Sequence, residues 1–487
     1  MSGTDSSTLD RANERTGREA RSCDVAVIGG GIAGLTAAFR LRSAGLSVRL
    51  FEASERLGGP LISRKTSGHL FELGPNTVPS TAPTLGRLID DLGLRGEVSL
   101  SRPVAGRRLI WRHGRLHALP EKPPQLLRCS AISPGARLRL LAEPLIPRRR
   151  DDGAETLLEF GLRRLGRGAT AGLLDPFITG VFAGRLDRLG VDAVPRLRAW
   201  EREHGSLFRA LLALKRKTAA DRAPDRASHR GPAPLVSFPD GLERLPRRLA
   251  DRLGDTAATG CPVIAIERVG RSFRVVVRNG TTDRVHAANA VVAATPAHAT
   301  AHLLEHQLEA DDSAFLASID HPFVATVGLG YRRSDIGHPL DAFGLLVASD
   351  SRLEPSADVL GILFPSSIFA DRAPPGRVTL TVMIGGARDP GASSADDDAL
   401  VRRARTAVER ILDARGRPSF VELARWPRAI PQYAPGHNDR ALALRERLAD
   451  GLAVAGNYLD GVGVEGAIVS AETAASAILA NRQETGA

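Results

Sequence analysis

The chain has 487 residues, of which 43% are hydrophobic and 25% charged, and its formal net charge is +11. These fractions are typical of a soluble globular protein, and the length predicts two to three domains. No apolar stretch reaches the ~20 residues that cross a bilayer, and no zinc spacing, helix-turn-helix or RNA-binding pattern accompanies the positive charge. We therefore expect no nucleic-acid partner, whereas anionic lipid and an acidic substrate remain open.

Three well-separated cysteines, without a Cys-x-x-Cys or histidine cluster, indicate neither a disulfide framework nor a metal site. Residues 1–21 carry charges of both signs and no apolar segment, which predicts a disordered tail and not a signal peptide. These two features predict a cytoplasmic protein.

Residues 23–52 predict a dinucleotide site. A buried parallel strand is expected at 25–28, a helix from 32 to about 44 and a second strand at 47–51. The turn after the first strand holds a G-x-G-x-x-G motif made of Gly29, Gly31 and Gly34. In that motif the first glycine permits the turn, the second lets backbone approach a pyrophosphate, and the third lets the helix pack closely. Glu52 ends the second strand, where a carboxylate accepts ribose hydroxyls.

The sequence ASERLGG at 53–59 follows directly. Arg56 can reach a phosphate, while Gly58 and Gly59 let backbone amides meet the cofactor without a Cβ in the way. A hairpin is expected next, before Phe71 to Asn76, and then a short helix at 84–92.

In the middle of the chain the predicted secondary structure changes from strands to helices and then to a connector. Residues 108–120 predict a hairpin that turns at His113-Gly114, and residues 130–217 are mainly helical. The stretch 144–150 sets apolar residues beside three cations, which suits an anionic membrane surface and equally a solvated basic loop. Residues 219–234 predict a flexible connector.

A nucleotide-domain pattern returns at 238–300, with a helix ending near 253 and strands at 262–267, 273–278 and 290–294. Four further strands, expected to form an antiparallel sheet that roofs a pocket, lie at 324–329, 344–347, 359–364 and 378–384. A helix at 400–414 and a strand at 452–455 follow, then a glycine-rich turn at 456–464 and a closing helix at 466–479. This second strand, turn and helix can close a cofactor groove.

From about Asp24 onward, the chain resembles the FAD-dependent, oxygen-using protoporphyrinogen oxidase family of the amine oxidase superfamily. The motifs that carry the resemblance are GGGIAG at 29–34, ExSxRLGG at 52–59, ELGPN at 72–76, GVFAG at 180–184, FPDGL at 238–242, WPRAIPQYAPGH at 426–437 and GNYLDGVGV at 456–464.

The resemblance implies an α/β fold with a discontinuous Rossmann-type FAD-binding domain, a β-rich substrate domain and a mostly helical membrane-contacting domain. The expected boundaries are a tail at 1–21, FAD-binding segments at 22–95, 236–300 and 415–487, helices at 96–218, a connector at 219–235 and the substrate domain at 301–414.

The family reaction is the six-electron oxidation of a porphyrinogen to a porphyrin in haem biosynthesis, with FAD as hydride acceptor, dioxygen as final acceptor and hydrogen peroxide as by-product. The resemblance places Gly180 by the pyrrole nitrogens, Arg108 on a propionate and Leu346, Leu363 and Met383 on the macrocycle, with no side-chain base. Each of these apolar residues also fits a plain sheet core. Pro60 and Ile62 stand where animal-type members carry an aromatic residue and a propionate-binding arginine.

The resemblance also implies a set of cofactor-binding residues. They are Gly29, Gly31, Ile32, Ala33, Gly34, Glu52, Ala53, Arg56, Gly58, Gly59, Gly74, Pro75, Asn76, Thr77, Val263, Trp426, Gly456, Asn457, Gly461, Val462 and Val464.

Alternatives stay open at this point. Coproporphyrinogen III differs from protoporphyrinogen IX by two extra propionates, which the sequence does not resolve. Amine oxidases often place a lysine near the flavin, but no lysine follows Lys217. Carotenoid-type desaturases lack the 426–437 run, and a non-catalytic GDP-dissociation-inhibitor-like protein would not need both glycine motifs. Peripheral contact with the inner face of the cell membrane is expected, and a homodimer is left open.

Overall fold

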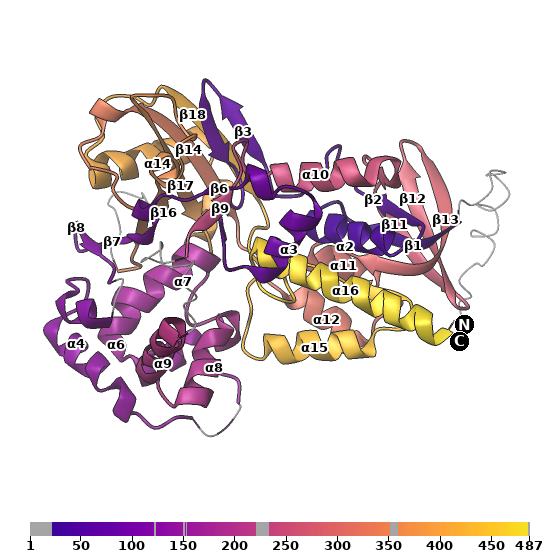
Figure 1. Ribbon diagram of the computed structural model, residues 1–487, viewed down its shortest axis with the longest axis horizontal. Coiled ribbons are helices and arrows are strands. Elements are labelled where there is room, and N and C mark those ends of the chain that lie inside the picture. The colour runs from indigo at the N-terminus through magenta and orange to yellow at the C-terminus, as the bar shows by residue number, and fades with distance from the viewer. Residues whose placement is uncertain are drawn as a thin grey trace.

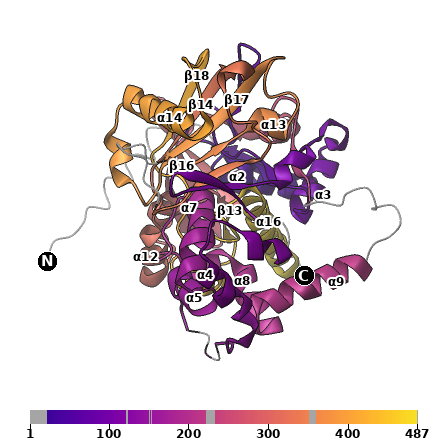
Figure 2. The same cartoon turned by 90° about the vertical axis from the view of Figure 1, so that its left-hand side faces the viewer.

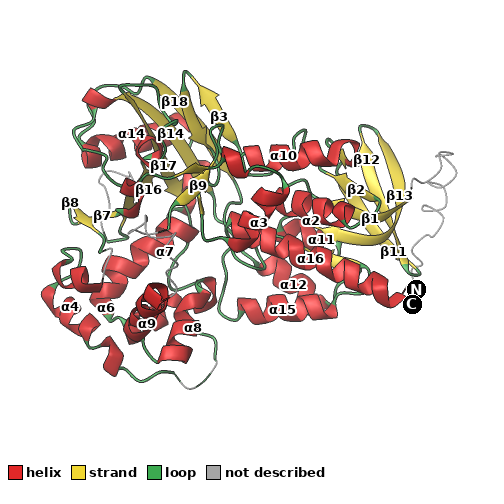
Figure 3. Cartoon of the chain, viewed as in Figure 1, coloured by secondary structure: helices red, strands yellow, loops and turns green. Residues whose placement is uncertain are grey.

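The computed structural model describes residues 22–120, 123–149, 151, 153–220, 233–350 and 359–485, so the tail expected at 1–21 lies outside the described residues. Two sheet-containing halves lie side by side, and a cluster of helices lies below one of them (Figure 1). Coloured by secondary structure, the sheets occupy opposite ends of the molecule (Figure 3).

The first sheet has the strand order β10-β2-β1-β13-β12-β11, and β19 also pairs with β13. β1, β2, β10, β13 and β19 run parallel, while β11 to β13 form an antiparallel meander. The strands are β1 (Ser22–Ile28), β2 (Val48–Phe51), β10 (Ala257–Ala258), β11 (Val263–Val269), β12 (Ser272–Asn279), β13 (Thr282–Ala293) and β19 (Leu452–Val454).

Helices cover both faces of this sheet, as the apolar run in β1 requires. Val25 and Val27 pack into a core with α2 (Ile32–Ser43), α3 (Pro83–Asp91), α10 (Arg244–Leu253) and α16 (Val464–Thr485). The alternate residues Ala26 and Ile28 pack into a second core with α11 (Ala297–Leu303), α12 (Ala310–Ser318) and α15 (His437–Arg447). The expected strand, helix and strand at 25–51 are therefore confirmed.

The second sheet has the order β18-β14-β17-β16-β15-β7-β8 and is antiparallel except for the β15–β7 pair. Its strands are β7 (Leu109–Arg112), β8 (Arg115–Ala118), β14 (Val324–Arg332), β15 (Gly344–Val347), β16 (Val359–Leu363), β17 (Arg377–Gly385) and β18 (Phe420–Trp426). α14 (Asp397–Leu412) packs on one face and shares its core. The β7–β8 hairpin turns at His113 (φ 50°) and Gly114 (φ 75°), as expected.

The helical cluster is confirmed and lies beneath the second sheet, with α9 extending to one side (Figure 2). Its helices are α4 (Pro134–Leu141), α5 (Leu157–Arg164), α6 (Arg167–Ala169), α7 (Asp175–Phe182), α8 (Pro195–His204) and α9 (Leu207–Ala220). Short strands outside the two large sheets are β3 (Ser63–Thr66), β4 (His69–Glu72), β5 (Val78–Pro79), β6 (Ser99–Leu100) and β9 (Leu235–Ser237). Within the described part of the chain, no helix is long and apolar enough to cross a membrane.

Three of the expected segment boundaries need correction. Residues 109–118, expected with the helices, form strands of the second sheet because β7 pairs with β15. Residues 301–318, expected in the substrate domain, pack on the first sheet through Leu304, Phe315 and Leu316. β18, expected in the last FAD-binding segment, pairs with β14 of the second sheet. The connector expected at 219–235 begins within α9, and residues 221–232 lie outside the described residues.

Candidate functional site

The first glycine turn is shaped by two backbone contacts. Gly29 has φ +104°, and a Cβ on Gly34 would lie 1.8 Å from the carbonyl oxygen of Gly29. A Cβ on Gly31, by contrast, would meet no heavy atom within 4 Å. The first and third glycines are therefore required by the protein's own packing, while Gly31 faces open space that a ligand can fill. Ile32 and Ala33 follow as the buried first residues of α2.

The 53–59 segment is joined to that turn. The Gly58 N–H donates to the Gly30 carbonyl at 2.8 Å, and a Cβ on Gly59 would lie 3.2 Å from the Gly31 Cα. Arg56 donates to the carbonyl of Leu57 at 2.8 Å and also to that of Gly59. In this structure Arg56 therefore stabilises the turn that surrounds the open space.

Glu52 lies at the end of β2, beside both glycine segments. Its Oε2 accepts from the Gly30 N–H at 2.5 Å, and its Oε1 accepts from the N–H and hydroxyl of Ser54 at 2.8 and 2.7 Å. Because a carboxylate has about four acceptor positions, these contacts fix its orientation and leave acceptor capacity for ribose hydroxyls. Ala53 follows it in the chain, and Val263 lies half-buried at the start of β11.

A second glycine turn repeats this geometry after β19. Gly461 has φ +120°, and a Cβ on Gly466 would lie 2.1 Å from the Gly461 carbonyl oxygen, the same five-residue relation as between Gly29 and Gly34. A Cβ on Gly463 would again meet nothing within 4 Å. Because β1 and β19 both run parallel to β13, the two turns leave the same edge of the sheet.

Tyr433 and His437 hold the loop that carries the second turn. The Tyr433 hydroxyl donates to the Asn457 carbonyl at 2.8 Å and accepts from the Gly461 N–H at 2.9 Å. The His437 ring stacks on Tyr433 at 3.8 Å, and its Nε2 lies 2.7 Å from the Tyr458 carbonyl. Burial lowers the pKa of His437 to about 4, so the ring is neutral and Nε2 donates. The 426–437 run thus acts here as a clamp on the 456–464 loop.

Gly456, Val462 and Val464 lie within that clamped loop and at the start of α16. The Gly456 N–H donates to the Ser470 hydroxyl at 3.0 Å, and the Asn457 side chain donates to the Val462 carbonyl at 3.3 Å. The first bond joins the start of the loop to α16, and the second bridges the loop internally.

The predicted residues 74–77 and Trp426 come together at the junction of the two halves. Trp426 Nε1 donates to the Leu73 carbonyl at 2.8 Å, and a Cβ on Gly74 would lie 2.0 Å from the Pro60 carbonyl oxygen. Asn76 donates to the Gly74 carbonyl at 3.0 Å, while its buried Oδ1 has no partner among the described residues. Pro75 and Thr77 are half-buried in the same loop.

These observations test whether FAD fits. The open second positions of the two glycine turns, Gly31 and Gly463, suit the pyrophosphate. The Glu52 carboxylate at the end of β2 suits the ribose. The acceptor Asn76 Oδ1, unpartnered among the described residues, suits a flavin N–H. The helices α2 and α16 begin at these turns, and their free N–H groups favour an anion. The donors and acceptors therefore suit FAD. No group of three metal-ligating side chains occurs among the described residues.

The residues predicted to hold the substrate share one face of the second sheet. Leu346 pairs with Gly361, and Gly361 pairs with Met383 across β15, β16 and β17. Leu363 lies two residues beyond Gly361 and thus on the same face. Arg108 lies two residues before Ile110, the partner of Leu346, and its guanidinium lies 5.3 Å from the centre of the Phe343 ring. The structure thus places an apolar wall with an arginine at one end.

Gly180 faces that wall from α7, which packs against β15 and β16. A Cβ on Gly180 would lie 2.2 Å from Leu346 Cδ2, so a larger residue here would displace the Leu346 side chain. Phe177 and Val181, which the sequence analysis did not select, lie three residues before and one residue after Gly180 and are each 43% exposed. Their i, i+4 spacing beside the glycine was the available signal for an open apolar face.

Gln432 links this helix to the clamp. Its side chain donates to the Phe182 carbonyl at 2.9 Å, and its backbone N–H donates to the Asp320 carbonyl at 2.9 Å. Gln432 therefore joins the 426–437 run to α7 and to the segment that precedes β14.

Comparison with known proteins gives a family match over most of the chain. The model of the flavin containing amine oxidoreductases matches residues 32–479. Coproporphyrinogen III oxidase of Propionibacterium freudenreichii is 31% identical over 97% of this chain and 95% of its own length. Protoporphyrinogen oxidase 2 of Arabidopsis thaliana is 28% identical over 93% of each chain.

Solved structures share the fold. A protein from Exiguobacterium sp. 255-15 superposes with a TM-score of 0.79 at 23% identity, covering 95% of this chain and 99% of its own. Cyclohexylamine oxidase from Brevibacterium oxydans gives a TM-score of 0.68 at 17% identity, with coverage of 95% and 99%.

Proposed function

The chain belongs to the flavin-containing amine oxidoreductase family and is an FAD-dependent oxidoreductase, and from that premise we propose that it oxidises a porphyrinogen to a porphyrin. Both protoporphyrinogen and coproporphyrinogen III oxidases are among its relatives. The finer proposal is the six-electron oxidation of protoporphyrinogen IX, with dioxygen as final acceptor and hydrogen peroxide as by-product.

One observation carries this proposal. Leu346, Leu363 and Met383 form a continuous apolar face with Arg108 at its end, and Gly180 approaches that face from α7. A flat apolar macrocycle with carboxylates at its edge needs such a wall and at least one guanidinium. Trp426 ends the strand next to β14 and reaches the 73–77 loop, so the wall adjoins the proposed cofactor site.

FAD, when bound, supplies the hydride-accepting chemistry. The chain's own residues then have to bind the substrate, orient it and exclude water. The leucines and Met383 carry no ionisable group, so they hold the ring and keep water away from the reacting carbon. Arg108 fixes the ring in its plane through a carboxylate. The unbranched Met383 side chain adapts to a puckered ring.

A second candidate substrate, coproporphyrinogen III, is favoured by a guanidinium group at the other end of β15. Arg388 donates to the Val347 carbonyl at 2.9 Å, whereas the nearby Arg112 is ion-paired with Asp350 at 2.6 Å. β15 has four residues, which separates Arg388 from Arg108 by about 13 Å of strand. An arginine at each end of the wall suits a ring with carboxylates on opposite edges.

An aerobic assay with each porphyrinogen, following porphyrin fluorescence and peroxide, tests both candidates. Arg108→Ala should raise KM for either substrate, whereas Arg388→Ala should raise KM only for coproporphyrinogen. Arg107→Ala is the matched control, because Arg107 pairs with Asp341 at the surface. Absence of porphyrin formation from both substrates in flavin-loaded protein would reject the proposed function.

Membrane contact is a further part of this proposal. Leu138, Leu141 and Leu145 follow i, i+3 and i+7 spacing and are 69%, 46% and 82% exposed. The exposed Arg148 follows in the same segment and places a cationic group beside these apolar side chains, whereas Arg149 is ion-paired with Asp151 at 2.7 Å. Arg150 lies outside the described residues. We propose that this surface lies on anionic lipid at the inner face of the cell membrane and that the protein is cytoplasmic.

A further inference from the structure

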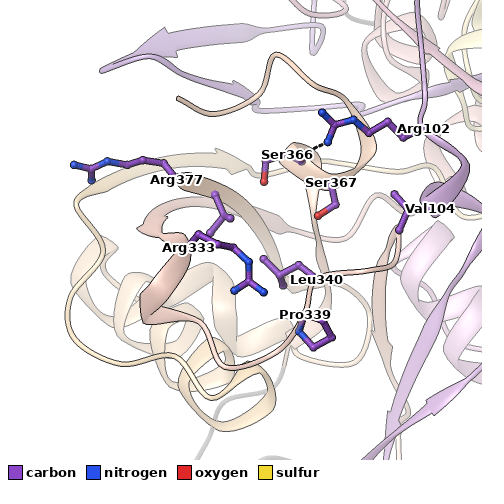
Figure 4. A pocket seen from close by; sticks show the side chains of 9 residues that line it. Arg102, Val104, Arg333, Pro339, Leu340, Ser366, Ser367 and Arg377 are labelled. Carbon is purple, nitrogen blue, oxygen red and sulfur yellow. Dashed lines mark hydrogen bonds between the residues drawn. The ribbon is translucent and has the colours of Figure 1, made fainter. Parts of the chain in front are cut away.

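A separate cavity of about 300 Å³ lies at the edge of the second sheet where β17 begins (Figure 4). Its lining comes from five places in the chain: the segment before β7, the turn after β14, the loop before β15, the turn after β16 and the start of β17. Arg377 in its lining and Met383 on the substrate wall are six residues apart in β17, about 20 Å along the strand. The cavity is therefore distinct from the proposed porphyrinogen site.

Three arginines and no acid line this cavity, namely Arg102, Arg333 and Arg377. Within the described ranges, none of the three forms an ion pair with a carboxylate. Arginines near the cavity are ion-paired: Arg107 pairs with Asp341 and Arg372 with Asp371. Three positive charges without a carboxylate partner in the described part of the chain therefore line the cavity.

Two of these guanidinium groups are held in place by carbonyl oxygens. Arg333 donates to the carbonyls of Ile336 at 2.7 Å and His338 at 3.0 Å, and Arg102 donates to the Ser366 carbonyl at 3.4 Å (Figure 4). A carbonyl accepts a hydrogen bond without cancelling the charge, so these groups are oriented and still attract an anion. The Arg377 side chain also lines the cavity, but its guanidinium points away from Arg102 and Arg333 (Figure 4).

The floor of the cavity is apolar. Leu340 and Val378 lie there with 3% and 6% of their surface exposed. Leu340 has φ +55°, a conformation that a bulky side chain rarely adopts, and its N–H donates to His338 Nδ1 at 3.0 Å. The strained turn sets an apolar side chain at the base of a cationic rim, so the site is amphipathic. Ser367 adds a hydroxyl to the lining.

We propose that this cavity binds a small molecule that carries an oxyanion, either a carboxylate or a phosphate, on a short apolar body. The inference goes beyond the proposed oxidation and does not depend on it. The lining segments are continuous with β15 and β16, which carry Leu346 and Leu363, and with β7, which follows Arg108, so the bound anion would lie at the outer end of the second sheet.

Calorimetric titration of the FAD-loaded full chain at constant ionic strength tests this, with inorganic phosphate in one arm and succinate in the other. We expect saturable binding of at least one probe, and the stronger arm identifies the oxyanion. The double variant Arg102→Gln/Arg377→Gln should weaken that binding at least tenfold, because it removes two of the three positive charges that line the cavity. Arg284→Gln is the matched control, since Arg284 is an exposed arginine on β13 far from the cavity.

Two results would overturn the proposal. One is that neither probe binds saturably to the parent protein. The other is that the double variant and the parent bind both probes equally, which would mean an adventitious ion only. Crystals soaked in selenate provide an independent measurement: the proposal requires the ion to bind in the cavity, between Arg102 and Arg333.

Discussion

Replacing Tyr433 with phenylalanine tests whether the 426–437 run holds the cofactor loop. The change keeps the ring and its stacking on His437 but removes the hydroxyl that joins the Asn457 carbonyl to the Gly461 N–H. Tyr433 is 2% exposed, so water cannot readily replace the lost partner. Leaving a buried donor and acceptor unpaired costs about 1–3 kcal/mol each, partly offset because a buried hydroxyl no longer has to be desolvated.

The expected net loss for Tyr433→Phe is therefore about 1–3 kcal/mol. If the loop is ordered only with FAD, this loss appears as an increase of roughly 5- to 150-fold in the FAD Kd. If the loop is ordered in the apoprotein as well, it appears in the free energy of unfolding. Both quantities should be measured, by flavin titration of the apoprotein and by urea denaturation, and their sum compared with the parent.

Tyr458→Phe is the matched control for this variant. Tyr458 lies in the same 456–464 loop, but its fully buried hydroxyl lies 3.1 Å from the Thr300 hydroxyl on α11 instead of bonding to Gly461. Tyr458→Phe should lower stability and change the FAD Kd less than Tyr433→Phe does. If Tyr433→Phe changes neither the FAD Kd nor the free energy of unfolding, the 426–437 run does not hold the loop in place.

Three other outcomes are expected. Gly34→Ala should lose flavin, because its Cβ would lie 1.8 Å from a carbonyl oxygen, and the flavin-to-protein absorbance ratio measures the loss. The control Gly86→Ala has open space in α3 and should gain up to ~1 kcal/mol of stability. Equal flavin loss in both variants would contradict this prediction. Burial raises the pKa of Glu72 from 4.5 to about 7, so the folded state binds more protons between these pH values and this group's contribution to stability falls as pH rises. Glu72→Gln should match the parent near pH 5 in urea denaturation and exceed it by on the order of 3 kcal/mol at pH 8, and parallel pH curves would disprove the assignment. Leu145→Asp should weaken sedimentation with anionic vesicles, and added salt should weaken the parent's binding too; unchanged binding of the variant would remove this surface from the membrane proposal.

The parts of the fold that sequence reasoning predicted are those built from local signals. The β1–α2–β2 unit and the β19–α16 unit each have an apolar strand, a glycine turn and a helix within about forty residues, and both formed as expected. β18 was missed because Glu422 and Arg425 interrupt its apolar pattern, and its residues are mostly half-buried. Its assignment depends on pairing with β14, nearly a hundred residues earlier in the chain.

The candidate site shows the same limit. The glycines and Glu52 could be selected because backbone geometry requires those residue types at that spacing. The clamp by Tyr433 could not be derived, because its partners Asn457 and Gly461 are 24 and 28 residues away and lie in a different element. Phe177 and Val181 were passed over because an apolar helical residue is usually core, and only the structure shows their exposure.

The two glycine turns come from distant parts of the chain, and this constrains when the cofactor can be captured during synthesis. Arg40 in α2 donates to Glu472 in α16 across 432 residues of sequence, and Glu465 accepts from the backbone N–H groups of Thr84 and Leu85. While a ribosome is still translating the second sheet, β13 has no β19 beside it and only one turn of the groove exists. Pairing between segments so far apart in the sequence is slow, and the apolar surfaces of α2 and α3 stay exposed to solvent until α16 has been synthesised. If both turns contact FAD, tight binding requires the late segment, and flavin supply during growth should then affect how much of this protein escapes aggregation.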